Sequence, residues 1–269
     1  MSKIKIIIMI IICGIVIILG VMLGSVSVSF NDVLRIIYHK LSQSIMPENI
    51  ASTSVAIVWN LRFPRALLAF IAGAALSVSG AVMQSVLRNP LASSYTIGVS
   101  SGASLGAGIV ILFGFSLPIL SSFTLPIMGF IFGLLTILAS ISLASKIDGQ
   151  MQNNTIILTG MVFSLFINSI TTLFSAIAKD QMQRLIYWQM GSFSMKDWET
   201  VSILAPIVII GTITITFFYN ELDIMTFGEE QAQTVGINIK KVKWILLILS
   251  AAITGSVISF VGIIGFVDL

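Results

Sequence analysis

Apolar runs of membrane length recur along the chain and constrain its fold more than any other feature. A hydrocarbon core of about 30 Å is crossed by about 20 apolar helical residues. Only 9% of the residues are charged and 57% are hydrophobic, whereas roughly 25% are charged in soluble domains. The pattern predicts an all-α, polytopic membrane protein with one transmembrane domain over 1–269. Its predicted spans are 4–24, 65–84, 95–114, 118–144, 154–178, 199–218 and 244–264.

The first two runs begin with different signals. Lys3 and Lys5 precede the uninterrupted apolar residues Ile6–Leu23, as in a secretory signal peptide. However, the run is longer than the usual hydrophobic region, and no small-residue cleavage site follows it. We therefore predict that 4–24 is retained as a span. Pro64 predicts the start of the second helix, because a residue in the first turn needs no N–H donor.

Residues that bind metals are too few and too scattered to predict a metal site. Cys13 is the single cysteine, so no disulfide within the chain is possible. His39 is the single histidine, and no cysteine or carboxylate clusters near it. We therefore expect no metal, no cofactor and no catalytic residue.

Charged residues are absent from the interior of the apolar runs. Ion-coupled pumps and carriers usually keep an intramembrane carboxylate or basic residue as a relay, so this pattern argues against that class. The chain also lacks a G-x-x-x-x-G-K-[ST] phosphate loop, and we expect no nucleotide hydrolysis by it. A transporter built in this way must take its energy from another subunit.

The lysines and arginines near the ends of the runs do not decide the orientation. With the N-terminus inside, seven of them are cytoplasmic and seven are outside. The positive-inside rule therefore gives no answer. The outer arginines become candidates for binding a partner, since topology does not require them.

Residues 219–243 form the one long polar segment between two apolar runs. Thr226 and Glu229 match a capping box, in which a hydroxyl and a carboxylate bind free N–H groups at a helix start. Glu230 adds negative charge that the helix dipole favours, and Gly236 is placed to end the helix in a left-handed conformation. A helix of about two to three turns is unstable alone. Two interpretations stay open: a solvated loop, or a helix that packs against a partner.

Small residues recur at helical spacing in the second and third runs. They are Gly73, Ser77, Gly80, Ala81, Gly98, Ser101, Gly102 and Gly106. Such stripes let helices approach closely in lipid, and the alternative is a path wide enough for a bulky solute. Gln84 and Asn168 are the polar side chains in or near the predicted helices, and we interpret them first as interhelical hydrogen-bond formers.

Residues 180–191 predict a further short helix outside the membrane. Tyr187 and Trp188 are typical of a membrane interface. An interfacial anchor and a gating helix over the outer mouth both remain open. The apolar residues that fall at helical spacing are Met182, Leu185, Ile186 and Met190.

Seven sequence blocks carry a resemblance to a known family. The first four are 59–65 (WNLRFPR), 72–84 (AGAALSVSGAVMQ), 88–92 (RNPLA) and 97–103 (IGVSSGA). The others are 188–193 (WQMGSF, followed by Asp197 and Trp198), 227–236 (FGEEQAQTVG) and 261–267 (VGIIGFV). Each block is weak alone. Together, in this order, they resemble the permeases of type II ABC importers for iron–siderophore complexes, haem and vitamin B12.

The resemblance implies an orientation and a set of partners. The N-terminus and residues 220–243 would be cytoplasmic, in a multi-pass protein of the cell membrane. The partners implied are a second permease in a homo- or heterodimer, two ATPase subunits and an extracytoplasmic substrate-binding protein, with no nucleic acid. The residues implied to contact the ATPase are Thr226, Gly228, Glu229, Glu230, Ala232 and Gly236.

The same resemblance implies a docking site for the binding protein. Arg62 would meet an acidic residue of that protein, with Arg65 as its neighbour, because a guanidinium can grip a carboxylate through two hydrogen bonds. The alternative is that Arg62 anchors a helix end by snorkelling.

Two features depart from the family. Members usually continue to about ten helices, whereas this sequence stops at Leu269, and Asp268 stands where the family usually has glycine. We expect a truncated chain, a decayed copy, or remaining helices supplied from elsewhere. An iron(III)–siderophore is the expected solute, with haem or a corrinoid as the alternative. An inactive copy remains open, and an ion-coupled carrier is disfavoured.

Overall fold

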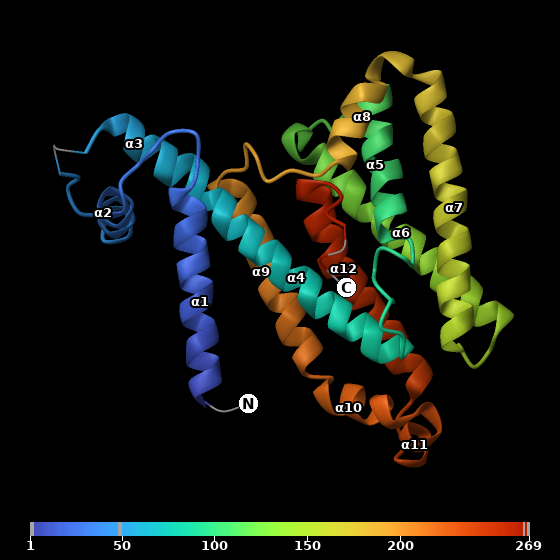
Figure 1. Cartoon of the computed structure of the whole chain (residues 1–269). Helices are drawn as coiled ribbons and strands as arrows, with labels where there is room; N and C mark the ends of the chain where they lie inside the picture. The colour runs from blue at the N-terminus through green and yellow to red at the C-terminus, as the bar shows by residue number, and fades with distance from the viewer. Residues whose placement is uncertain (1–2, 48–49, 266, 268–269) are drawn as a thin grey trace. The chain divides into compact units, whose positions relative to one another are not determined.

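The computed structural model describes residues 3–47, 50–265 and 267, and these residues form helices and connecting turns with no β-strand (Figure 1). The long helices are α1 (Lys3–Met22), α4 (Phe63–Leu87), α6 (Thr124–Ile147), α7 (Asn153–Ile177), α9 (Trp198–Thr216) and α12 (Ile239–Val261). The shorter elements are α2 (Phe30–Leu41), α3 (Ser52–Ala56), η1 (Ile57–Arg62), α5 (Val99–Phe113), η2 (Ser121–Phe123), η3 (Lys179–Gln181), α8 (Met182–Gln189), α10 (Tyr219–Phe227) and α11 (Glu229–Thr234).

Six helical segments of the described residues are long and apolar enough to cross a membrane. They are Lys3–Met22, Ser52–Leu87, Ser121–Ile147, Asn153–Ile177, Trp198–Thr216 and Ile239–Val261. The remaining predicted span, 95–114, holds the shorter helix α5. This helix starts later than predicted because Arg88 and Gly98 have positive φ angles and the chain between them is not helical. The prediction of an all-α, polytopic fold is confirmed.

The chain divides into two compact units, Met1–Ile71 with Phe193–Ala205, and Ala72–Ser192 with Pro206–Leu269. The first unit contains α1, α2, α3, η1 and the first parts of α4 and α9. Its core is built around Val21, Val33, Ile36 and Val58, which are all fully buried. The amphipathic helix α2, which the sequence analysis did not predict, supplies two of these four residues.

The second membrane helix begins earlier than Pro64 predicted, since the helical segment runs from Ser52 to Leu87. Residues Ile57–Arg62 are π-helical, and the N–H of Phe63 donates to the carbonyl of Val58. Each N–H in this π-helix donates to the carbonyl five residues earlier, so the carbonyl of Trp59 pairs in position with Pro64, which has no N–H to donate. The indole Nε1 of Trp198 donates to this carbonyl instead, at 2.8 Å. The proline therefore lies inside the helix, and a side chain satisfies the acceptor that it leaves free.

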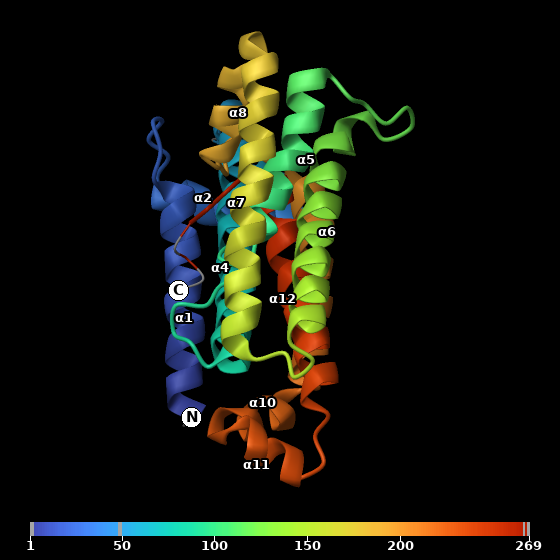
Figure 2. The same cartoon turned by 90° about the vertical axis from the view of Figure 1, so that its right-hand side faces the viewer.

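The second unit is a bundle in which α5 packs against α6, α7 and α12 (Figure 2). Its helix ends lie at two opposite ends of the bundle. The connection between α6 and α7 and the helix α11 lie at one end, and α8 lies at the other, as both views show. Leu185 of α8 is buried against Ala107 and Leu112 of α5. The predicted short helix at 180–191 is thus present, with Tyr187 exposed.

Candidate coupling site

The polar segment 219–243 contains two short helices, and the predicted capping box is wrong. Thr226 lies inside α10, where its hydroxyl donates to the carbonyl of Asp223 at 2.6 Å. The N-cap of α11 is Gly228, which has φ 141° and offers no side-chain cap. The T-x-x-E pattern fits the residue types, but the preceding helix α10 extends through its first residue. Glu229 is therefore free to bind elsewhere.

The end of α11 matches its prediction. Gly236 has φ 92°, a left-handed conformation that a glycine adopts without strain. Its N–H donates to the carbonyl of Gln233 at 2.9 Å, and the N–H of Ile237 donates to the carbonyl of Ala232 at 3.0 Å. This pair of hydrogen bonds is a Schellman motif, which satisfies the last carbonyl groups of the helix.

One face of α11 is buried and the other is open. Ala232 is fully buried, and Glu230 and Gln233 are exposed. Phe227 and Val235 flank the helix with 77% and 67% of their surface exposed. Two large apolar side chains thus lie exposed on either side of this short polar helix.

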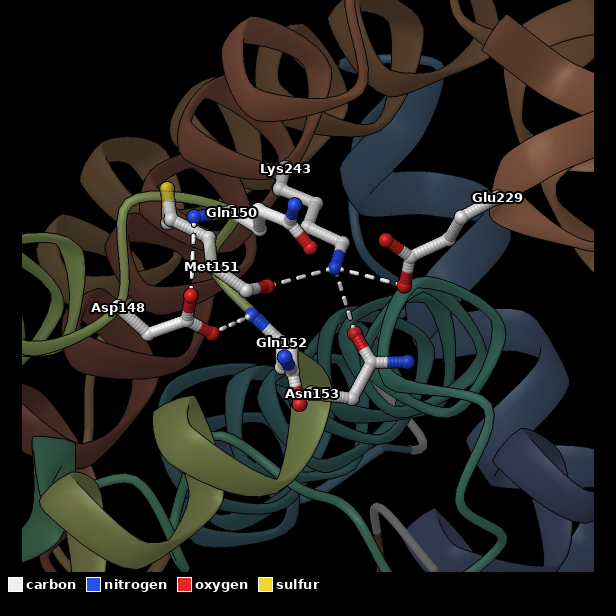
Figure 3. A network of polar contacts seen from close by, with 7 residues as sticks. All are labelled: Asp148, Gln150, Met151, Gln152, Asn153, Glu229 and Lys243. Atoms are coloured by element: carbon white, nitrogen blue, oxygen red, sulfur yellow. Dashed lines mark hydrogen bonds and ion pairs between the residues drawn. The ribbon is translucent and has the colours of Figure 1, made fainter.

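The side chain of Lys243 on α12 is fully buried, and it joins α11 to another segment of the same unit (Figure 3). Its Nζ donates to Glu229 Oε1 at 2.8 Å, to the carbonyl of Met151 at 2.8 Å and to Asn153 Oδ1 at 2.7 Å. An ammonium has three donors, so this one is fully satisfied. We name these four residues the Lys243 junction.

The turn between α6 and α7 is held in place by Asp148. Its carboxylate accepts hydrogen bonds from the backbone N–H groups of Gln150 at 3.0 Å and Gln152 at 2.7 Å. The N–H groups of Gln152 and Gln150 lower the pKa of the Asp148 carboxyl, because they stabilise its charged form. The turn and α11 line a common groove of about 640 Å³.

The sequence analysis counted Lys243 only among the cations near the ends of the apolar runs, although a signal for its burial was present. Ile239, Lys243, Leu246 and Leu247 share one helical face by their spacing, and the apolar members of that set are buried. A lysine in phase with a buried face requires acceptors. The identity of those acceptors could not be read from the sequence, because two of them are about 90 residues away.

Arg62, the predicted docking residue for a binding protein, is buried with 6% of its surface exposed. Its guanidinium donates to the carbonyls of Met22 at 2.9 Å and Val21 at 3.4 Å, and also to the carbonyl of Val26. These contacts cap the C-terminus of α1. Because the guanidinium is buried, it does not snorkel to the membrane surface as the alternative held. Arg65 is half-buried and has no hydrogen bond or ion pair within the described parts of the chain.

The small residues of α5 fill a helix contact. A Cβ on Gly102 would lie 2.4 Å from the carbonyl oxygen of Phe132, and a Cβ on Gly106 would lie 2.3 Å from that of Met128. Ser101 is buried and donates to the carbonyl of Gly98 at 2.9 Å. The stripe therefore packs α5 against α6, as the first interpretation held, and a path along it is not supported.

The stripe on α4 is less tightly filled. Gly80 is buried, whereas a Cβ on Gly73 would meet nothing within 4 Å. Gln84 is half-buried. On α7, Asn168 is exposed, although it lies within an apolar span. Asn168 on α7 is thus exposed, as are Ser77 and Ala81 of the α4 stripe, whereas the small residues of α5 are buried.

These features define a polytopic helical membrane protein with a short helix, ended by a Schellman motif, between two spans. Residues 10–269 match the FecCD transport family, and the chain belongs to that family. It is 36% identical over 94% of its length to the uncharacterized ABC transporter permease protein YvrB of Bacillus subtilis, covering 71% of that protein. It is 31% identical over 88% of its length to the cobalamin import system permease protein BtuC of Halobacterium salinarum, covering 62% of it.

A third relative and a solved structure extend the comparison. The hemin transport system permease protein HmuU of Yersinia pestis is 32% identical over 79% of the chain, which covers 64% of that relative. A solved structure described as an inward-facing conformation of a metal-chelate type ABC transporter matches with a TM-score of 0.79. It is 26% identical, with 96% of this chain and 76% of that chain covered. The chain thus spans between 62% and 71% of the length of these curated relatives.

Asp268, the departure from the family noted above, lies outside the described residues.

Proposed function

We propose that this chain is a permease subunit of an ABC importer and that a separate ATPase drives it through α11. The observation that supports this proposal is the geometry of α11 in a chain of the FecCD transport family. The exposed side chains of Phe227 and Val235 give a partner an apolar surface to cover at this helix. In this arrangement residues 220–243 and the N-terminus are cytoplasmic, and the protein lies in the cell membrane with a second permease as its dimer partner.

The docking of the ATPase can be tested by changing α11 alone. Glu230→Lys reverses an exposed charge, and Gly236→Pro imposes a φ near −65° where the chain has 92°. We expect the double variant to lose co-purification of the ATPase. The control is Asp180→Lys, which makes the same charge change on an exposed residue of η3. This element lies at the opposite end of the unit (Figure 1), so the control variant should still co-purify with the ATPase. Equal capture of the ATPase by both variants would contradict the docking site.

The solute path is proposed to follow α7. Asn168 and Thr172 are exposed one helical turn apart, and they border a groove of about 730 Å³ between α7 and α8. A polar side chain that faces lipid is unfavourable, so this face requires water or protein beside it. Asn168→Cys should react with a membrane-impermeant thiol reagent, and Leu165→Cys, on an apolar exposed position of the same helix, should not. Equal reactivity would contradict the path.

The outer binding protein is proposed to dock on Arg65. Its guanidinium is half-buried and without a partner among the described residues, whereas that of Arg62 is committed to α1. Arg65→Glu should weaken docking of the binding protein by reversing the charge that meets its carboxylate. If Arg65→Glu leaves docking of the binding protein unchanged and a folded Arg62→Gln variant loses it, Arg62 is the docking residue.

We propose an iron(III) chelate as the solute. A solved relative is described as a metal-chelate transporter, and another relative is named as a permease for Fe(3+) dicitrate. Other relatives are named for hemin, cobalamin and molybdate. Uptake of radiolabelled iron from a siderophore, in cells whose only importer contains this permease, tests the proposal. Transport of hemin or cobalamin without transport of the chelate would replace it.

A further inference from the structure

The Lys243 junction connects two segments that are far apart in the sequence. Glu229 belongs to α11 and lies 14 residues before Lys243, whereas Met151 and Asn153 lie 92 and 90 residues before it. All three acceptors meet one ammonium, as Figure 3 shows. The helix α11 and the end of the α6–α7 turn are therefore bound to one and the same buried group.

The turn is shaped to present an acceptor to that ammonium. Met151 has φ 54°, which is unusual for a residue with a side chain, and its side chain is fully buried. The conformation is held by the backbone bonds to the Asp148 carboxylate and by a bond from the N–H of Met151 to the carbonyl of Asp148 at 3.0 Å. A backbone in a sparsely populated conformation persists only where its surroundings require it.

We propose that Lys243 is a positioning residue that makes α11 and the α6–α7 turn move as one body. The inference rests on the proposed docking of the ATPase to α11. Separating the two segments would leave a buried ammonium or carboxylate without its partner, which is strongly unfavourable. Force applied to α11 would thus reach the first residue of α7, the helix that carries the proposed solute path.

The two sides of the junction are unequal, and this makes the proposal testable. Asn153 and the carbonyl of Met151 bind Lys243 to the turn, whereas Glu229 alone binds it to α11. Glu229 has 28% of its side chain exposed. Glu229→Ala should therefore free α11 from the junction while Lys243 stays attached to the turn. Asp223→Ala is the matched control, because it removes an exposed carboxylate from the neighbouring helix α10, at a position assigned neither to the junction nor to the docking site.

The experiment uses the assembled importer in lipid nanodiscs, with ATP as the probe. Two exposed positions receive a spin label in a Cys13→Ser background: Gln233→Cys on α11 and Gln150→Cys on the turn. We expect ATP to change the spectra of both labels in the parent and in Asp223→Ala. In Glu229→Ala the label on α11 should still respond, and the response at Gln150→Cys should fall by about fivefold or more, as for loss of coupling between linked sites.

Each result decides between the two proposals. Equal responses at Gln150→Cys in Glu229→Ala and in the parent would overturn the junction and leave the docking of the ATPase intact. Lack of any ATP response at Gln233→Cys in the parent would contradict the docking and, with it, the junction.

Asn153→Ala, compared with Asn154→Ala at the exposed neighbouring residue, provides a second test from the other side of Lys243. It should lower the response at Gln150→Cys, and Asn154→Ala should not.

Discussion

Arg62 and Lys243 are both buried cations, one in each compact unit, and they differ in what they bind. Arg62 donates to the backbone carbonyls of Val21, Met22 and Val26, all within one stretch of chain at the end of α1. Lys243 donates to a carboxylate, an amide and a carbonyl from two distant segments. The first set ends a helix, and the second set ties separate segments together.

The comparison shows that burial of a charge does not by itself indicate function. A cation at the C-terminus of a helix is favoured by the helix dipole and by the free carbonyl groups there. Capping the C-terminus of α1 is sufficient to explain why Arg62 is buried. Lys243 lies near the N-terminus of α12, where the dipole disfavours a cation. Its burial therefore depends on Glu229 and on the turn, and that dependence is what links the segments.

The largest effect is expected from Lys243→Met. The substitution leaves the Glu229 carboxylate and the Met151 carbonyl without a donor, and breaking a buried pair in this way costs about 3–5 kcal/mol. The free energy of unfolding in detergent, measured by chemical denaturation, should fall accordingly. A loss below that of Arg62→Met would contradict the importance given to the junction.

A smaller loss is expected from Arg62→Met. Its acceptors are uncharged carbonyl groups at a helix end, and leaving such groups unsatisfied costs about 1–3 kcal/mol. The same denaturation measurement compares the two variants directly. If Arg62 docks a binding protein and does not act as a cap, Arg62→Met should leave stability unchanged and should abolish docking.

Gly24→Ala tests the packing around Arg62 without removing its charge. A Cβ at this position would lie 2.5 Å from a terminal nitrogen of the guanidinium. The guanidinium would have to shift away from its three carbonyl acceptors, and each hydrogen bond lost in this way costs about 0.5–1.5 kcal/mol. Gly14→Ala is the control, since a Cβ there meets nothing within 4 Å, and it should be neutral or slightly stabilising. Equal melting temperatures for the two variants would contradict the contact.

The positions of most membrane helices followed from the sequence because hydropathy and length constrain them directly. The helix α2 was missed, although Ser29 caps it by accepting from the N–H of Asp32 at 3.1 Å. Its apolar residues Val33 and Ile36 form a narrow stripe within a mostly polar segment. A search limited to runs of membrane length does not detect such an amphipathic helix.

The candidate site was predictable only in its local parts. Gly236 was placed correctly, since a left-handed helix end depends on one residue and its neighbours. Thr226 was misplaced because the T-x-x-E pattern carries no information on the helix that precedes it. The pairing of Lys243 with Met151 and Asn153 depends on how α12 packs beside the α6–α7 turn. No local pattern encodes that contact.

The smallest effect concerns the turn on one side of the junction and depends on pH. The N–H groups of Gln152 and Gln150 hold the pKa of the Asp148 carboxyl below its ordinary value. The stability that this carboxylate contributes is therefore fully present above its unfolded-state pKa of about 3.9. It is lost as the pH falls through the lower pKa of the folded protein.

Asp148→Asn should remove this dependence, because the amide carries no charge to titrate. We expect the variant to melt at a lower temperature than the parent at neutral pH, and the difference to shrink as the pH falls below about 4. Asp180→Asn is the control, since the Asp180 carboxylate accepts no hydrogen bond within the described residues. A constant difference across this range would show that the carboxylate holds the turn by its shape and not by its charge. The Lys243 junction would then depend on one charged pair, Glu229 with Lys243, and on no second charge in the turn.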